Sequence, residues 1–170
     1  MQLASLDPKL RSALESIYEE VMWLSKRPNV TPGRARAWYT HIMAESVKRK
    51  LRRFTGQVSA KAVEATVEPL MLEHFMRIQT TLSQLVERHR TNDLDDRDDF
   101  LTTLVEFEQV HIVTRGENYD AMRAKGNYEL AGIKLVHWAD VPPARQQALW
   151  NSMLRGKVAN SVEFVPSNDT

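Results

Sequence analysis

The sequence predicts a mostly helical α+β protein that forms a single domain over residues 1–170. In the N-terminal part, apolar side chains recur every three or four positions, which is the spacing of one helix face. After Glu108, short β-branched and apolar stretches alternate with helical ones, as in a strand–helix–strand–helix unit. We expect four to five helices over residues 1–108, two or three strands within residues 109–165, and a frayed tail over residues 166–170.

The first two helices are predicted from start and stop signals. The first runs from Asp7, whose carboxylate suits a helix N-terminus, to about Arg27. The second is predicted from Pro32 to Phe54, because Pro suits a first helical turn and Gly56 favours the left-handed conformation that ends a helix.

Three further helical segments follow. One begins after the cap Ser59, and another runs from about Pro69 to Arg90 with a clear apolar stripe. A further helix begins in DDFLTTLVEFE, where aspartates are favoured by the positive N-terminal end of the helix. The same aspartates do not form a calcium loop, because the twelfth position counted from Asp93 is Leu104 and not Glu.

In the C-terminal part, the β-branched and apolar stretches QVHIVT and IKLVHW predict two strands. Between them, Thr114 and Glu117 have the spacing of a capping box, which starts a short helix. A last helix is expected to end near Arg155, and SVEFV is read as a third, edge strand.

The composition is that of a soluble globule, because apolar residues make up 42% and charged residues 26% of the chain. The absence of cysteine excludes disulfides, zinc fingers, thiolate metal sites and cysteine nucleophiles. The N-terminus lacks the apolar core of a signal peptide, and the apolar runs are far shorter than the roughly 20 residues that span a bilayer. We therefore expect a cytoplasmic protein with no membrane partner.

The densest charge lies in SVKRKLRRFTG, which places five cationic side chains in the six positions from Lys48 to Arg53. On the predicted helix, four of them stand at i, i+1, i+4 and i+5 and form one stripe. Because the formal net charge is only +1, attraction to DNA or RNA has to come from this stripe, through phosphate contacts. The predicted nucleic-acid-binding residues are Lys48, Arg49, Lys50, Arg52 and Arg53, with secondary contacts from Arg34, Arg36 and Arg115.

Two other interpretations of the stripe stay open. Cationic side chains near a helix C-terminus are favoured by the helix dipole, so the stripe is also typical of a solvated helix face. It could instead pair with acidic residues, from Asp93–Asp99 of the same fold, from a second copy in a homo-oligomer, or from an acidic partner protein. The protein would then be a helical interaction module.

A metal site is a further hypothesis. His111 and His137 lie on the two predicted strands. If the strands are neighbours, the two imidazoles could bind a divalent metal together with Glu117, Asp140 or the Glu73–His74 pair. No HExxH pair sets such a geometry locally, so the sequence favours the explanation that both are polar residues on a half-exposed sheet face. His89 lies on an apolar helix stripe and is expected to be a satisfied residue near the core.

Two remaining features have structural explanations. The turn at Thr114–Gly116 offers helix N-terminal amides and Arg115 to a phosphate, but the capping box explains it without a ligand. The four tryptophans are expected in the core rather than in a cofactor cage; they are Trp23, Trp38, Trp138 and Trp150. No motif for a phosphate loop, a dinucleotide or a serine nucleophile is present, so the question of an enzyme stays open.

Three short stretches carry a resemblance: EHF at Glu73–Phe75, VHIVTRGEN at Val110–Asn118 and YELAGIKLV at Tyr128–Val136. Together they resemble small phage-encoded proteins, and they are loosely similar to the His and Asn elements of HNH-type nucleases. The resemblance implies His74, Glu73 and Asn118 as catalytic residues, with His111 and Glu117 at a divalent metal such as Mg²⁺. The closing His of an HNH motif is missing after Asn118, so no cofactor is firmly indicated.

The sequence as a whole favours a nucleic-acid-binding protein, with DNA as the first expectation. The alternatives are a metal-dependent HNH-like endonuclease and a helical protein–protein interaction module or homodimer.

Overall fold

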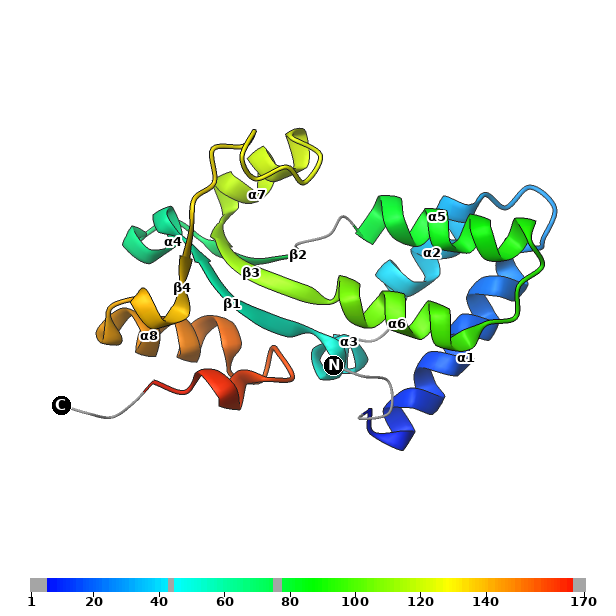
Figure 1. Cartoon of the computed structure of the whole chain (residues 1–170), viewed down its shortest axis with the longest axis horizontal. Coiled ribbons are helices and arrows are strands. Elements are labelled where there is room, and N and C mark those ends of the chain that lie inside the picture. The colour runs from blue at the N-terminus through cyan, green and yellow to red at the C-terminus, as the bar shows by residue number, and fades with distance from the viewer. Residues whose placement is uncertain (1–5, 43–44, 75–77, 167–170) are drawn as a thin grey trace. The chain divides into compact units, whose positions relative to one another are not determined.

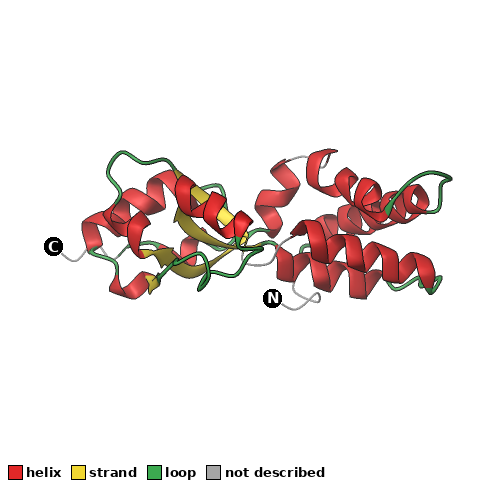
Figure 2. Ribbon diagram, turned by 90° about the horizontal axis from the view of Figure 1, so that it is seen from above, coloured by secondary structure: helices red, strands yellow, loops and turns green. Residues whose placement is uncertain are grey.

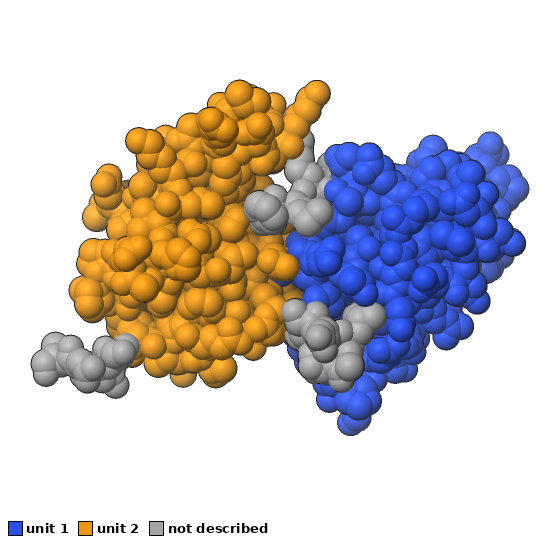
Figure 3. Space-filling model, in the orientation of Figure 1, with its two compact units in different colours: residues 1–50, 77–108 blue, residues 51–76, 109–170 orange. Residues whose placement is uncertain are grey.

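The chain folds as the mostly helical α+β structure that the sequence predicts, 59% helical with a four-stranded mixed sheet (Figures 1 and 2). The computed structural model describes residues 6–42, 45–74 and 78–166. Contacts divide the chain into two compact units, which Figure 3 colours separately. Unit 1 comprises residues 1–50 and 77–108, and unit 2 comprises residues 51–76 and 109–170.

Unit 1 consists of helices in the residues that the structure describes. Asp7 starts the first helix as predicted, since its carboxylate accepts hydrogen bonds from the amides of Lys9 and Leu10. Asp96 caps the last helix, with Asp98 and Asp99 in its first turn, as the acidic stretch predicts. The helices are α1 (Pro8–Ser25), α2 (Pro32–Ala37), the π-helical η2 (Trp38–Ile42), α3 (Glu45–Leu51), α5 (Ile78–Thr91) and α6 (Arg97–Phe107).

The core of unit 1 forms where α1 packs against α5 and α6. Leu14, Tyr18 and Phe100 are at most 2% exposed there. His89 is fully buried among them, and its ring nitrogens hydrogen-bond to the Tyr18 hydroxyl (3.2 Å) and to Asp99 (2.7 Å). The prediction of a satisfied histidine near the core is therefore confirmed.

Unit 2 contains the sheet, in the strand order β2-β3-β1-β4. The inner strands β1 and β3 are parallel, and each edge strand is antiparallel to its neighbour. The strands are β1 (Arg53–Ser59), β2 (Leu70–His74), β3 (Gln109–Thr114) and β4 (Leu135–His137). The helical segments are α4 (Ala60–Glu64), α7 (Arg115–Arg123), η3 (Trp138–Asp140), α8 (Pro143–Leu149), the π-helical η4 (Trp150–Leu154) and η5 (Ser161–Phe164).

Two of these strands correct the sequence prediction, which places residues 53–54 and 70–74 in helices. In β1, Phe54 and Val58 are buried in the core while Thr55 and Gln57 point to the other face, a period of two that belongs to a strand. Gly56 has a φ of +81° at a register irregularity in the pairing with β3, a conformation that glycine adopts easily. Residues 53–59 and 70–74 therefore belong to the sheet instead of extending the helical part.

The C-terminal end differs in two further points. The last predicted helix is α8 followed by a π-helical turn, and the predicted edge strand SVEFV is a short 3₁₀ helix instead. Its Phe164 packs edge-to-face on Phe54, with ring centroids 4.7 Å apart, so this segment covers the sheet rather than extending it. Of the predicted frayed tail, Pro166 is buried and residues 167–170 lie outside the described residues.

The two faces of the sheet differ in chemistry. One face packs an apolar core against α8 and η4, with Val58, Ile112 and Leu149 fully buried. On the other face, register pairing places Glu73 opposite His111. Gln57 and His137 are also paired, so this face carries a row of polar side chains.

Candidate functional site

The stretch from Pro32 to Gly56, here called the basic segment, holds seven Lys or Arg residues and a single acidic residue, Glu45. It comprises α2, η2, α3 and the first residues of β1. Three of its cations, Lys48–Lys50, follow one another in the last turn of α3. The segment thus concentrates positive charge in a chain whose net charge is only +1.

The cations of this segment do not form one helix stripe, which corrects the prediction. Helix α3 ends at Leu51, which is fully buried, and Arg53 already belongs to β1. The chain leaves the helix here because Phe54 is drawn into the core of the sheet. Lys48–Lys50 therefore belong to unit 1, whereas Arg52 and Arg53 belong to unit 2.

The three cations of α3 have different surroundings. The Lys48 ammonium donates a hydrogen bond to the carbonyl oxygen of Thr40 (2.7 Å) and is half-buried. Arg49 is exposed, and its Nε lies 3.6 Å from Oε1 of Glu45, a loose ion pair. Lys50 is exposed and forms no ion pair with any residue that the structure describes. Arg49 and Lys50 are therefore the cations of α3 that are most available to a ligand.

The other predicted contacts are spread over both units. Arg34, in α2, is exposed, while Arg36 is half-buried and reaches the Thr40 hydroxyl at 3.4 Å. In unit 2, Arg53 pairs with Glu163 at 2.7 Å. The exposed cations of the basic segment are therefore chiefly Arg34 in α2 and Arg49 and Lys50 at the end of α3.

The acidic turn does not neutralise these cations through the pairs that the structure describes. Asp93 binds Lys26 (2.8 Å), and Asp98 binds Arg11 (2.5 Å). Asp99 pairs with Arg88 and His89. These ion pairs lie within unit 1, and they place the carboxylates on cations outside the basic segment. Three carboxylates of the acidic turn are thus engaged by side chains outside the basic segment.

The turn before α7 is filled by the protein's own groups. Thr114 and Glu117 form the predicted capping box, in which the Thr114 hydroxyl accepts from the Glu117 amide (3.2 Å). The Gly116 amide donates to Oε1 of Glu68 at 3.1 Å. Arg115 is exposed and lies beside Tyr119, with 3.3 Å between Nη2 and the hydroxyl. A carboxylate of the chain thus already occupies the position predicted for a phosphate.

Glu117 is a structural residue of unit 2. It is 2% exposed, and its Oε2 accepts hydrogen bonds from the Ser59 hydroxyl and from the Thr114 amide (3.0 Å). Ser59 in turn caps α4, since its hydroxyl accepts from the Ala62 amide at 3.0 Å. Among the described residues, no group of three or more His, Cys, Asp or Glu side chains could hold a metal ion.

His111 lies in the polar row of the sheet and is 5% exposed. Its Nδ1 shares a hydrogen bond of 2.6 Å with the Thr55 hydroxyl. Burial lowers the pKa of His111 from 6.5 to about 4, so the ring is neutral at pH 7. The ring of Tyr128 packs edge-to-face on it, and burial, reinforced by the charges of Glu73 and Glu117, raises the pKa of that phenol.

The residues that the nuclease resemblance implies do not come together in one site. Glu73 and His74 are adjacent in β2, so their side chains point to opposite faces of the sheet. Glu73 pairs with His111, while His74 pairs with Val110, whose side chain is in the apolar core. Asn118 is half-buried in α7. The structure thus brings Glu73 to His111 but separates Glu73 from His74.

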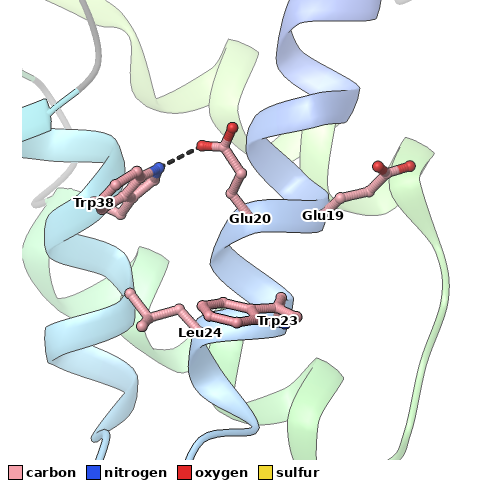
Figure 4. Close-up of a pocket in the computed structure, with 5 residues that line it drawn as sticks. All are labelled: Glu19, Glu20, Trp23, Leu24 and Trp38. Atoms are coloured by element: carbon pink, nitrogen blue, oxygen red, sulfur yellow. Dashed lines mark hydrogen bonds between the residues drawn. The ribbon is translucent and has the colours of Figure 1, made fainter.

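The tryptophans divide into two pairs. Trp138 is 8% exposed, and Trp150 packs partly buried against the core of unit 2, as expected. Trp23 and Trp38 are 60% and 39% exposed, which corrects the prediction that they lie in the core. Both line a pocket in unit 1 that the sequence prediction misses (Figure 4). The exposure of Trp23 has a sequence signal, because Trp23 lies four positions from Glu19 on a polar side of α1.

Comparison of the chain with models of protein families, with curated proteins and with solved structures found no match. Among the described helices, none combines the length and the apolar character of a helix that crosses a membrane.

Proposed function

We propose that the protein binds nucleic acid, with DNA as the first expectation, through the basic segment Pro32–Gly56. The observation that carries this proposal is the imbalance of charge, seven Lys or Arg residues against the one carboxylate of Glu45. The exposed head groups of Arg49 and Lys50 give that charge access to a ligand.

Electrostatics makes a polyanion the natural ligand of such a segment. Each Lys or Arg that contacts a phosphate releases condensed counterions, so binding depends steeply on salt and little on base sequence. The acidic turn that would compete for these cations is engaged by Lys26, Arg11 and Arg88. Lys48 and Arg36 are half-buried, and their head groups reach Thr40. They therefore attract a phosphate electrostatically from a distance rather than by direct contact.

The test is a fluorescence-polarisation titration of a labelled random DNA duplex between about 50 and about 200 mM salt. The wild-type chain should bind, and log K should fall linearly with log salt. In the double variant Arg49→Glu/Lys50→Glu, the slope should shrink by about two, since two phosphate contacts are lost.

The matched control is Lys125→Glu/Lys134→Glu, which makes the same change of net charge at two exposed lysines of unit 2. It should bind as the wild type does. If both double variants lost the same affinity for DNA, the attraction would depend on net charge alone, and the proposal would be wrong. Absence of binding by the wild type at low salt would also overturn it, and would leave the interaction module as the better hypothesis.

A further inference from the structure

Unit 1 contains a pocket of about 320 Å³ between α1 and η2. It is lined by Glu19, Glu20, Trp23, Leu24 and Trp38 (Figure 4). Four of these residues come from one stretch of α1, and Trp38 is the first residue of η2. Single π-helical turns are rare and occur frequently at functional sites. We refer to this site as the indole–carboxylate pocket.

The side chains of the pocket combine aromatic surface with negative charge. Trp23 and Trp38 are 60% and 39% exposed, although indole rings are usually well buried. The Trp38 indole donates its Nε1 hydrogen to Oε2 of Glu20 at 2.5 Å, which fixes the ring beside the carboxylate (Figure 4). Oε1 of Glu20 has no hydrogen-bond partner among the described residues, so it can accept from a ligand.

Two residues of the pocket already recognise guanidinium groups of the chain itself. The Cζ of Arg27 lies 3.8 Å from the ring centroid of Trp23, a cation–π contact. Nη2 of Arg97 lies 3.0 Å from Oε1 of Glu19, an ion pair. Stacking on an indole and pairing with a carboxylate are two of the modes in which a planar guanidinium is bound, whereas an ammonium has no plane to stack.

We propose that the indole–carboxylate pocket binds the side chain of an arginine presented by a partner polypeptide. The guanidinium stacks on the exposed indole surface and donates to Glu20. Glu19 is already paired with Arg97, so the carboxylate that remains for a ligand is that of Glu20. A carboxylate repels a phosphate, so this site is separate from the proposed contact with nucleic acid. Trp and Arg are also the residues that most often dominate the energy of protein interfaces, where they fill pockets and are shielded from water.

The experiment follows the four indole N–H signals of the ¹⁵N-labelled full chain by NMR. The probe is a blocked Gly-Arg-Gly peptide, and the matched control is the same peptide with citrulline, which has the shape of arginine without its charge. The signals of Trp23 and Trp38 should shift and saturate with the arginine peptide. Those of Trp138 and Trp150 should not move, because they lie in unit 2.

Two variants test the two parts of the site. Glu20→Gln keeps an oxygen that accepts from the Trp38 indole but removes the charge, and it should weaken binding about tenfold, the usual effect of losing one charged hydrogen bond. Trp23→Leu keeps an apolar side chain but removes the stacking face, and it should weaken binding several-fold. Both variants should retain the wild-type pattern of the Trp138 and Trp150 signals, which reports that the chain is folded.

Three results would overturn the proposal. The citrulline peptide could bind as well as the arginine peptide, which would leave no role for charge. A Gly-Lys-Gly peptide could bind equally well, which would contradict recognition of a guanidinium plane. The Trp23 and Trp38 signals could stay unchanged throughout the peptide titration, in which case the pocket does not bind arginine.

Discussion

Two regions of the molecule are rich in chemically active side chains, and they use them in opposite ways. The basic segment presents Arg49 and Lys50 to solvent at the end of a helix. The hydrogen-bonded network around Glu117 in unit 2 instead buries its polar groups, and Ser59 and Thr114 are at most 1% exposed. In the network each donor is satisfied by an acceptor of the chain. The basic segment instead holds seven Lys or Arg residues and one acidic residue of its own.

The same residue types can therefore stabilise the fold where they are buried, or bind a ligand where they are exposed. Glu117 and Thr114 stand in a motif that suggests anion or metal binding, yet their hydrogen bonds join the end of β3 to the start of α7 and to Ser59. A buried, satisfied group stabilises the fold and has little capacity left for a ligand. Exposed charge contributes little to stability but remains available for binding.

The largest effect on stability is expected for Glu117→Ala. The substitution leaves the Ser59 hydroxyl and the Thr114 amide buried without their acceptor, and each orphaned donor costs on the order of 1–3 kcal/mol. We expect a loss of about 4 kcal/mol in the free energy of unfolding, measured by urea titration with circular dichroism.

The matched control is Glu129→Ala, which removes an exposed carboxylate of the same unit and should change stability by less than about 0.5 kcal/mol. If both variants were equally stable, the buried network would contribute no more to the free energy of unfolding than an exposed carboxylate does. The contrast between the two regions would then be wrong.

The second effect concerns pH and His111. Its pKa is about 4 in the folded chain and has its ordinary value of 6.5 when unfolded, so the unfolded chain takes up the proton first as the pH falls. The stability that the neutral ring provides is therefore complete above pH 6.5 and is lost as the pH falls toward 4. The loss amounts to about 3 kcal/mol.

Urea midpoints of the wild type and of His111→Gln, measured at about pH 7 and about pH 4.5, check this prediction. Carboxylates titrate in the same range, but they are common to both proteins, so the difference between the two isolates the histidine. The wild type should lose more stability than the variant on acidification. Parallel losses would show that the buried imidazole has no part in the pH dependence.

Local signals account for the elements that the sequence predicts correctly. The caps Asp7 and Ser59 and the capping box at Thr114 mark real helix starts, because each satisfies backbone amides within three residues. Strand β3 is likewise apparent from its β-branched, apolar composition.

The elements that the sequence prediction misses depend on distant partners. Phe54 in β1 pairs with Val110, and Leu70 in β2 pairs with Thr114, so both strands depend on partners that lie more than 40 residues away in the sequence. The local apolar spacing around these residues also fits a helix, and nothing nearby in the chain favours the strand.

The candidate sites show the same division. The cluster Lys48–Arg53 is visible in the sequence as charge, but its division between a helix end and a strand follows from the burial of Phe54. The indole–carboxylate pocket is missed because Trp38 comes from a different helix, and a tryptophan in a helical pattern is more often part of the core. Conversely, Glu73 and His74 are neighbours in sequence but point apart on β2.

The smallest effect compares the helix caps of the two regions. Thr31 caps α2 at the start of the basic segment, where its exposed hydroxyl accepts from the Arg34 amide at 3.2 Å. Thr31→Ala should cost about 1 kcal/mol, because solvent can replace the hydrogen bond that is lost. Thr31→Ser keeps the hydroxyl and should be close to the wild type.

The corresponding change in the buried network, Ser59→Ala, removes the cap of α4 and also the donor to Glu117, with no solvent to replace either. It should therefore cost clearly more than Thr31→Ala in the same urea titration. Equal costs would mean that burial does not distinguish the two caps. The contrast between a buried structural network and an exposed binding segment would then have to rest on charge alone.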